Sequence, residues 1–239
     1  AQASMLFLAA VAMTMPAIYE LVDGSGLPPP GAERVPYGPT VEWLSFAVAL
    51  VLIANYAAGL VFSLRTHRDL FNPHRNEASE PDQDRAPWSV RRAVVALAVA
   101  GVAVGVMSEI LVGSIGEAAH KIGLSEFFVG AIVVAIVGNA AEHWVAVLVA
   151  RKDKMDLAVN IAIGSSTQIA LFAVPVLVLL SFFVGPDRMP LVFNGFELGG
   201  VILAVMIAQY VTNEGESTWF EGVQLLAVYA LLAVAFAVA

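Results

Sequence analysis

The sequence contains no cysteine and little charge: only 13% of its 239 residues are Asp, Glu, Lys or Arg. The absence of cysteine excludes a disulfide framework and a thiolate metal site. No basic patch is present, which argues against a nucleic-acid partner. No positively charged residue precedes the first apolar run, so we do not interpret that run as a signal peptide.

The remaining composition is strongly apolar. Hydrophobic residues make up 59% of the chain, and the mean hydropathy of +0.80 is far above that of a soluble domain. These values predict an all-α, polytopic membrane protein. Seven runs are apolar and long enough to cross a hydrocarbon core of about 30 Å as helices, at about residues 3–22, 43–64, 93–113, 127–150, 157–184, 189–211 and 222–239.

The basic residues are distributed unequally between the two sides that seven spans define. One side would carry Arg65, Arg68, Arg75, Arg85, Arg91, Arg92, Arg151, Lys152 and Lys154. The other would carry only Arg34, Lys121 and Arg188. Because cytoplasmic loops are enriched in Lys and Arg, we expect the first side to be cytoplasmic. The hydrophilic connection 66–92 is then a cytoplasmic linker, and we interpret residues 114–126 as a short outer loop.

The fourth apolar run contains an acid far from either of its ends. Glu142 has fifteen uncharged residues before it and eight after it. An acid at that depth costs about 2.5–3.5 kcal/mol on insertion scales and by default marks a functional site. On a helix, the i, i+3, i+4 spacing of Asn139, Glu142 and His143 places an amide, a carboxylate and an imidazole on one face.

The fifth run carries a second polar interruption, Gly164-Ser165-Ser166-Thr167-Gln168. Gly138 and Gly164 weaken the two helices beside the polar groups, so we expect freed backbone carbonyls at both places. The long fifth run should also bend near Gly164 or Pro175. Paired interruptions of this kind point to the binding site of a transporter.

The polar groups favour a hard cation. Carboxylate, amide and hydroxyl oxygens are hard ligands, and calcium binds roughly 6–8 oxygens. A single glutamate balances two positive charges poorly. Something outside these two helices must therefore supply more negative charge.

The two motifs resemble those of the calcium/proton exchanger family. The resemblance rests on Gly138-Asn139-Ala140-Ala141-Glu142-His143 followed by Gly164-Ser165-Ser166-Thr167-Gln168. It implies half of an inverted-repeat cation exchanger, with discontinuous helices at the ion site. Residues 1–65 would be the last two helices of the first half, and 93–239 the second five-helix repeat. The first repeat's motif has no counterpart, so we expect an N-terminal repeat to be missing.

We expect Glu142 to be the principal metal ligand, with Asn139, Ser165, Ser166 and Gln168 supplying or orienting oxygens. The alternative for the two serines is back-bonding to helix carbonyls. His143 either relays protons with Glu142 or only bonds a neighbouring helix. The resemblance places Glu109 on a sliding helix, where it gates the site or binds a proton. Its alternative is an interfacial acid that reaches water.

The predicted function is proton-driven antiport of calcium, or of other divalent cations, by alternating access. This is secondary active transport rather than enzyme catalysis, with Ca²⁺ as substrate, H⁺ as counter-ion and no cofactor. The setting would be a bilayer, most simply a bacterial inner membrane, and a homo-oligomer is compatible with the sequence. The alternatives are a sodium-coupled carrier of the same architecture and an incomplete structural subunit. An intramembrane metalloenzyme would need His-Glu-x-x-His, which does not occur.

Overall fold

The computed structural model describes residues 2–30, 32, 35–66, 88–123, 125–185, 187–214 and 218–238. All regular secondary structure in these ranges is helical. Six helices are long and apolar enough to cross a membrane, and a bent helix pair raises the number to seven. The all-helical, multi-pass architecture predicted from the apolar runs is therefore confirmed.

The first two spans form an antiparallel pair. Helix α1 covers Gln2–Asp23, and α2 covers Pro39–Val61 and continues into the π-helical turn η1, Phe62–Thr66. Proline at the start of α2 lacks only an N–H that the first turn would leave unbonded, so it favours the helix start. A core cluster joins both helices to a later one: Ala9, Met13, Leu52 and Leu171.

Helix α4, Val90–Ile122, is the longest element. The Ser89 hydroxyl accepts a hydrogen bond from the backbone N–H of Arg92 at 3.3 Å and caps its start. The predicted outer loop at 114–126 is wrong over most of its length, because the helix continues to Ile122. Good helix formers occupy this stretch, and the chain leaves the helix only at Gly123, whose φ of +76° suits glycine.

The middle of the chain forms a long helical hairpin. Its first arm consists of α5 (Glu126–Phe128), η3 (Val129–Val134), α6 (Ala135–Gly138) and α7 (Ala140–Ala150). The second arm consists of α8 (Met155–Gln168), η4 (Ile169–Ala173) and α9 (Val174–Ser181). The turn between α7 and α8 contains Asp153, the one non-glycine residue with positive φ among those described.

The last two helices each begin with a reciprocal side-chain cap. Helix α10 is Gly195–Glu214 and α11 is Trp219–Val238. Asn194 Oδ1 accepts hydrogen bonds from the N–H groups of Phe196 and Glu197, and Glu197 Oε2 accepts one from the Asn194 N–H, each at 2.9 Å. Thr218 and Glu221 form the same capping box on α11.

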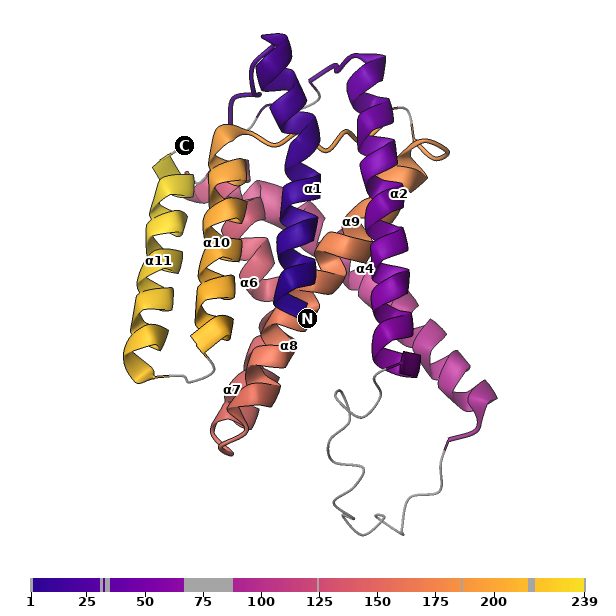
Figure 1. Cartoon of the computed structure of the whole chain (residues 1–239), viewed down its shortest axis with the longest axis vertical. Coiled ribbons are helices and arrows are strands. Elements are labelled where there is room, and N and C mark those ends of the chain that lie inside the picture. Colours follow the sequence, from indigo (N-terminus) through magenta and orange to yellow (C-terminus); the bar gives the residue numbers. More distant parts are fainter. Residues whose placement is uncertain are drawn as a thin grey trace.

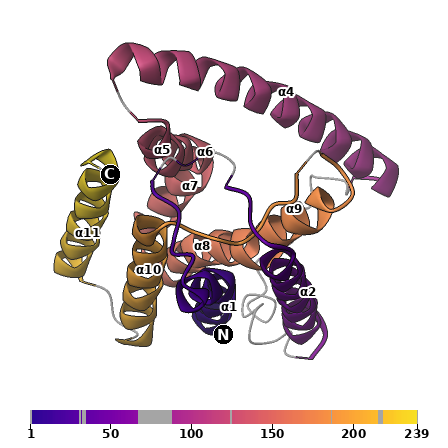
Figure 2. The same ribbon diagram turned by 90° about the horizontal axis from the view of Figure 1, so that it is seen from above.

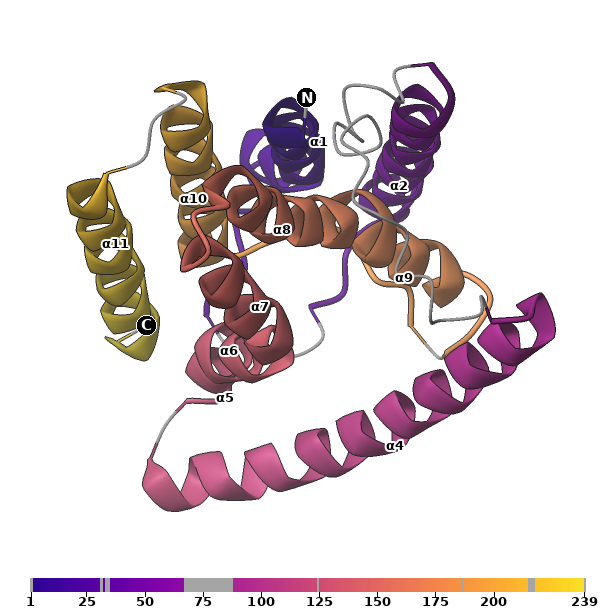
Figure 3. The same ribbon diagram turned by 90° about the horizontal axis from the view of Figure 1, so that it is seen from below.

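The helices are arranged in three layers. Figures 2 and 3 show α8 and α9 crossing the middle of the molecule, with α1, α2 and α10 on one side and α4 along the other. Leu171 and Val178 lie in the middle layer and are both fully buried. Leu171 packs against residues of α1 and α2, and Val178 packs against α2. In contrast, none of the residues in the apolar window of α4 is buried. The core of the described chain therefore lies between α1, α2 and the α8–α9 arm.

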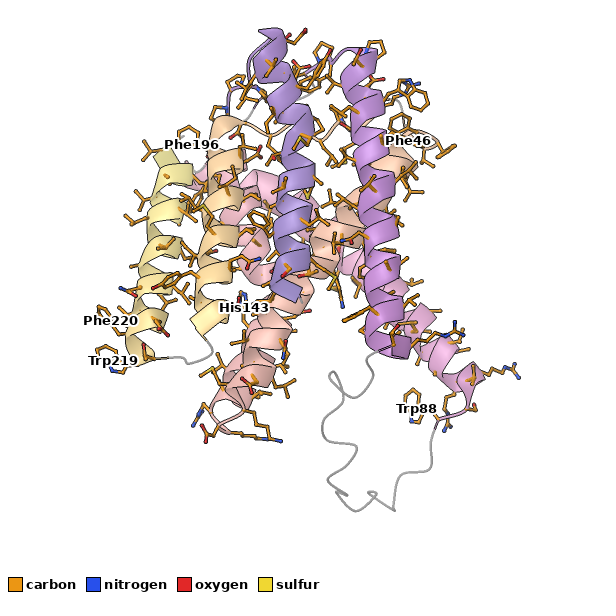
Figure 4. All side chains as sticks on the ribbon, in the orientation of Figure 1. Phe46, Trp88, His143, Phe196, Trp219 and Phe220 are labelled. Atoms are coloured by element: carbon orange, nitrogen blue, oxygen red, sulfur yellow. The ribbon has the colours of Figure 1, made fainter. Side chains whose placement is uncertain are left out.

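Large aromatic side chains lie near both ends of the bundle. Figure 4 shows Phe46 and Phe196 toward one end, and Trp88, Trp219 and Phe220 toward the other. Trp219 is 81% exposed and Trp88 63% exposed. Aromatic rings of this kind favour the two membrane–water interfaces, so their placement fits a bundle that spans a bilayer along its long axis.

Polar contacts connect the start of α2 to the loop before α10. The buried Ser45 hydroxyl donates to the Val41 carbonyl at 2.8 Å and accepts from the Leu191 N–H at 2.9 Å. One turn earlier, Glu42 Oε2 forms an ion pair with an Arg188 guanidinium nitrogen at 2.6 Å. These contacts fix two segments that lie far apart in the sequence.

Candidate ion-binding site

The α7–α8 hairpin brings the two motifs to the same depth. Glu142 precedes the end of α7 at Ala150 by about 12 Å of helix, and Ser165 follows the start of α8 at Met155 by about 15 Å, at 1.5 Å per residue. Half of a hydrocarbon core is about 15 Å. The antiparallel arms therefore present both motifs near the middle of the membrane.

The first motif contains a real break in the helix. The axes of Val129–Gly138 and Ala140–Ala150 differ by 54°, and Asn139 between them has φ −101° and ψ 14°. The carbonyl of Ala135 accepts hydrogen bonds from both the backbone N–H and the side-chain Nδ2 of Asn139, at 3.1 and 2.9 Å. This leaves Asn139 Oδ1 without a donor among the described residues, so it can serve as a ligand.

The second motif does not break its helix. Helix α8 runs through Gly164 to Gln168, so the prediction of freed carbonyls at Gly164 is wrong. The hydroxyls of Ser165, Ser166 and Thr167 donate to the carbonyls of Ile161, Ala162 and Ile163, at 2.9, 3.1 and 2.7 Å. The irregular segment is the π-helical η4, which begins directly after Gln168.

These bonds show back-bonding, the alternative considered for Ser165 and Ser166. A hydroxyl that donates its hydrogen keeps its oxygen lone pairs, so back-bonding does not exclude a role as ligand. Helix α8 stays helical through the glycine while it packs against α7 and α1. The metal-ligand role of the two serines stays a prediction.

Most of the predicted site is uncovered in this chain. Glu142, His143, Ser166 and Gln168 are exposed, whereas Asn139 and Ser165 are half-buried. Among the described residues no base pairs with Glu142, and no group of three or more His, Asp or Glu could hold a metal. The predicted ligands therefore lie on a largely exposed part of the hairpin.

The predicted proton and gating residues lie on two separate elements. His143 is exposed on α7 and its backbone N–H bonds the Asn139 carbonyl at 2.9 Å; Figure 4 shows its position toward the middle of the bundle. Glu109 is exposed on α4. The structure therefore places Glu142 and His143 on α7, and Asn139 at its start, on the arm that packs against α8, while the role of Glu109 stays a prediction.

The residues that cap the starts of α10 and α11 were not predicted from the sequence. Asn194-x-x-Glu197 and Thr218-x-x-Glu221 both match the spacing of a capping box, which was the available signal. Thr167 was part of the second motif but was given no role; it is only 4% exposed and lies between two candidate ligands. The two caps fix where α10 and α11 begin, and the Thr167 hydroxyl bonds the Ile163 carbonyl within α8.

A broken span beside a polar hairpin is typical of the binding sites of membrane transporters. The sodium/calcium exchanger protein family matches residues 92–238, more than half of the chain, and the chain belongs to that family. Similar relatives narrow the assignment. The Ca²⁺/H⁺ antiporter ChaA of Bacillus subtilis is 45% identical over 193 residues, covering 81% of this chain and 54% of the relative.

A Ca²⁺/H⁺ antiporter of Synechocystis is also 45% identical, over 210 residues that cover 81% of this chain and 55% of the relative. The solved structure of native YfkE covers all of this chain and 62% of its own, with a TM-score of 0.72 and 34% identity. The predicted resemblance to calcium/proton exchangers is confirmed. The chain spans about half the length of the curated relatives it matches.

Proposed function

We propose that this chain carries one half of the ion site of a proton-driven calcium antiporter that works by alternating access. The observation that carries the proposal is the exposed Glu142 carboxylate at mid-membrane depth, with Asn139 beside it and the oxygens of α8 on the facing arm. The relatives named as Ca²⁺/H⁺ antiporters support the choice of ions.

Competition between protons and calcium at Glu142 gives the exchange. A carboxylate removed from water favours its protonated form, and a bound divalent cation reverses that preference. The closed site can therefore cross loaded with protons or with calcium. An empty site with its carboxylates ionised is too costly to close within the membrane.

The rest of the site belongs to a first repeat in this proposal. Glu142, Ser166 and Gln168 form an open surface, and the apolar window of α4 has no buried residue. A homologous repeat with its own acid would cover both and supply the missing charge. Residues 1–65 would then end the first half, 66–92 would form a cytoplasmic linker, and 93–239 would be the second repeat in a bacterial inner membrane.

The test is calcium uptake into vesicles in which this chain is joined to a first repeat. Glu142→Gln keeps the size of the side chain and removes its charge, so proton-driven uptake should fall to the level of empty vesicles. Asp156→Asn, in the first turn of α8, is the matched control and should transport normally. Uptake retained by Glu142→Gln would rule out the assignment.

Sodium coupling is the second candidate, because the matching family is described by sodium/calcium exchange. The same vesicles separate the two candidates. An imposed sodium gradient without a pH gradient should drive no calcium uptake if protons are the counter-ion. Uptake driven by sodium alone would favour the sodium-coupled carrier.

A further inference from the structure

Two adjoining cavities lie among the end of α1 and the starts of α2 and α10. Figure 1 shows these three helix ends at the same end of the bundle. The two cavities have volumes of about 650 and 490 Å³. The wall they share is formed by Pro28, Pro29, Val35, Pro36 and Tyr37. This end is remote from the α7–α8 motifs and is the outer face in the proposed topology.

The charged residues among the described lining of the two cavities are mostly acidic. The acids are Glu20, Asp23, Glu42, Asp187 and Glu197. The one described base is Arg188, which already forms the 2.6 Å ion pair with Glu42 and lies 5.0 Å from the centre of the Phe182 ring. The remaining carboxylates therefore produce a negative potential that attracts cations.

Glu20 is the unusual member of this set. It lines the smaller cavity but is only 7% exposed, and its carboxylate makes no hydrogen bond or ion pair with any described residue. Its carboxylate oxygens are not among the fully buried polar atoms that lack a partner, so they open to the cavity. The backbone folds back over it: the Gly26 N–H donates to the Glu20 carbonyl at 3.3 Å, and Gly24 and Gly26 have φ of +84° and +78°, which suit glycine.

Other oxygens of the smaller cavity complete the environment of a hard cation. Asp23 follows Glu20 by three residues on α1, so the two carboxylates share a helix face. Ser25, Tyr37 and Thr40 bring hydroxyl groups to the same cavity. Burial raises the pKa of Tyr37, and the charges of Glu20 and Glu197 raise that pKa further. The negative charges of Glu20 and Glu197 therefore act on the Tyr37 phenol.

We propose that Glu20 and Asp23, with the Tyr37 hydroxyl, bind a divalent cation at the outer end of the bundle, separately from the mid-membrane site. Calcium takes about 6–8 oxygens, so loop carbonyls and water complete its shell. With two carboxylates the affinity should be weak, on the order of 10⁻⁴–10⁻³ M. Such a site raises the concentration of the cation at the outer mouth.

Terbium luminescence tests the proposal on the full chain in detergent. Tb³⁺ is a hard cation that replaces calcium and emits when a nearby tyrosine is excited. The emission lost in Tyr37→Phe isolates the signal of this site. Glu20→Gln and Asp23→Asn should each weaken that signal at least tenfold, and calcium should compete for it. Glu142→Gln and the control Asp156→Asn should leave it unchanged.

Two results would overturn the proposal: no Tyr37-dependent emission in the unmodified chain, or full emission in Glu20→Gln with a normal circular dichroism spectrum. Because Glu142→Gln is expected to bind normally here, failure of the antiport proposal is separable from failure of this one.

Discussion

Ser45 and Glu142 are two polar side chains inside membrane-spanning helices, and their surroundings differ. Ser45 is fully buried, and its hydroxyl both donates to Val41 and accepts from Leu191. Glu142 is exposed and pairs with no described base. The first residue therefore stabilises the fold by itself, whereas the second has a charge that only an ion, a proton or another chain segment can balance.

Ser45→Ala should destabilise the protein. The substitution leaves the buried N–H of Leu191 without an acceptor, which costs about 1–3 kcal/mol. Unfolding in detergent, followed by tryptophan fluorescence against denaturant, measures the change. Ser63→Ala is the matched control, since its exposed hydroxyl only back-bonds the Leu60 carbonyl at 3.2 Å. Equal effects of the two substitutions would contradict the role given to Ser45.

The two residues also differ in how far the sequence predicts them. Glu142 could be recognised because a charge deep in an apolar run has few explanations. Ser45 could not be recognised, because hydroxyl residues are ordinary in membrane helices and its partner is 146 residues away. Sequence reasoning finds groups that are costly by themselves and misses groups whose role depends on a distant segment.

At the scale of elements, the two motif helices carry similar local signals and behave differently. Gly138 and Gly164 both precede polar residues, yet only the first lies at a bend, of 54°. In α8 three consecutive hydroxyls bond carbonyls of the preceding turn within a continuous helix, and the irregularity falls in η4. The existence of a weak point was predictable, but its exact place depended on side-chain bonds and packing.

Asn194→Ala should shorten or loosen the start of α10. It removes the oxygen that accepts from two N–H groups of the first turn, at a cost of about 0.5–2 kcal/mol. The melting temperature in detergent should fall accordingly. Asn194→Asp keeps an acceptor oxygen and should restore most of the loss. If Asn194→Asp were as unstable as Asn194→Ala, the cap would not be the cause.

At the scale of the whole molecule, the sequence predicted the spans but not their neighbours. The runs at α1, α2 and α4 have similar hydropathy, yet α1 and α2 pack on the middle layer while the apolar window of α4 has no buried residue. A helix that is apolar all round carries no stripe to show which face meets protein and which meets lipid. The layer order in Figure 2 could therefore come only from the structure.

The proposed orientation in the membrane is testable, because the chain has no cysteine of its own. Ser25→Cys lies in the loop between α1 and α2, and Lys152→Cys lies in the turn between α7 and α8. The excess of basic residues near Lys152 predicts that this side faces the cytoplasm. In intact cells, a membrane-impermeant maleimide should label Ser25→Cys, and Lys152→Cys only after permeabilisation. The reverse pattern would invert the topology.

The capping boxes of α10 and α11 have a consequence for how the protein meets lipids of different length. The two helices are antiparallel, so the capped start of α10 lies at one end of the bundle and the capped start of α11 at the other (Figure 1). The capping side chains bond backbone N–H groups at the start of each helix. Unwinding these first turns to match a thinner bilayer would therefore break hydrogen bonds. The pair must lean instead, which would tie the angle of this edge of the bundle to acyl-chain length.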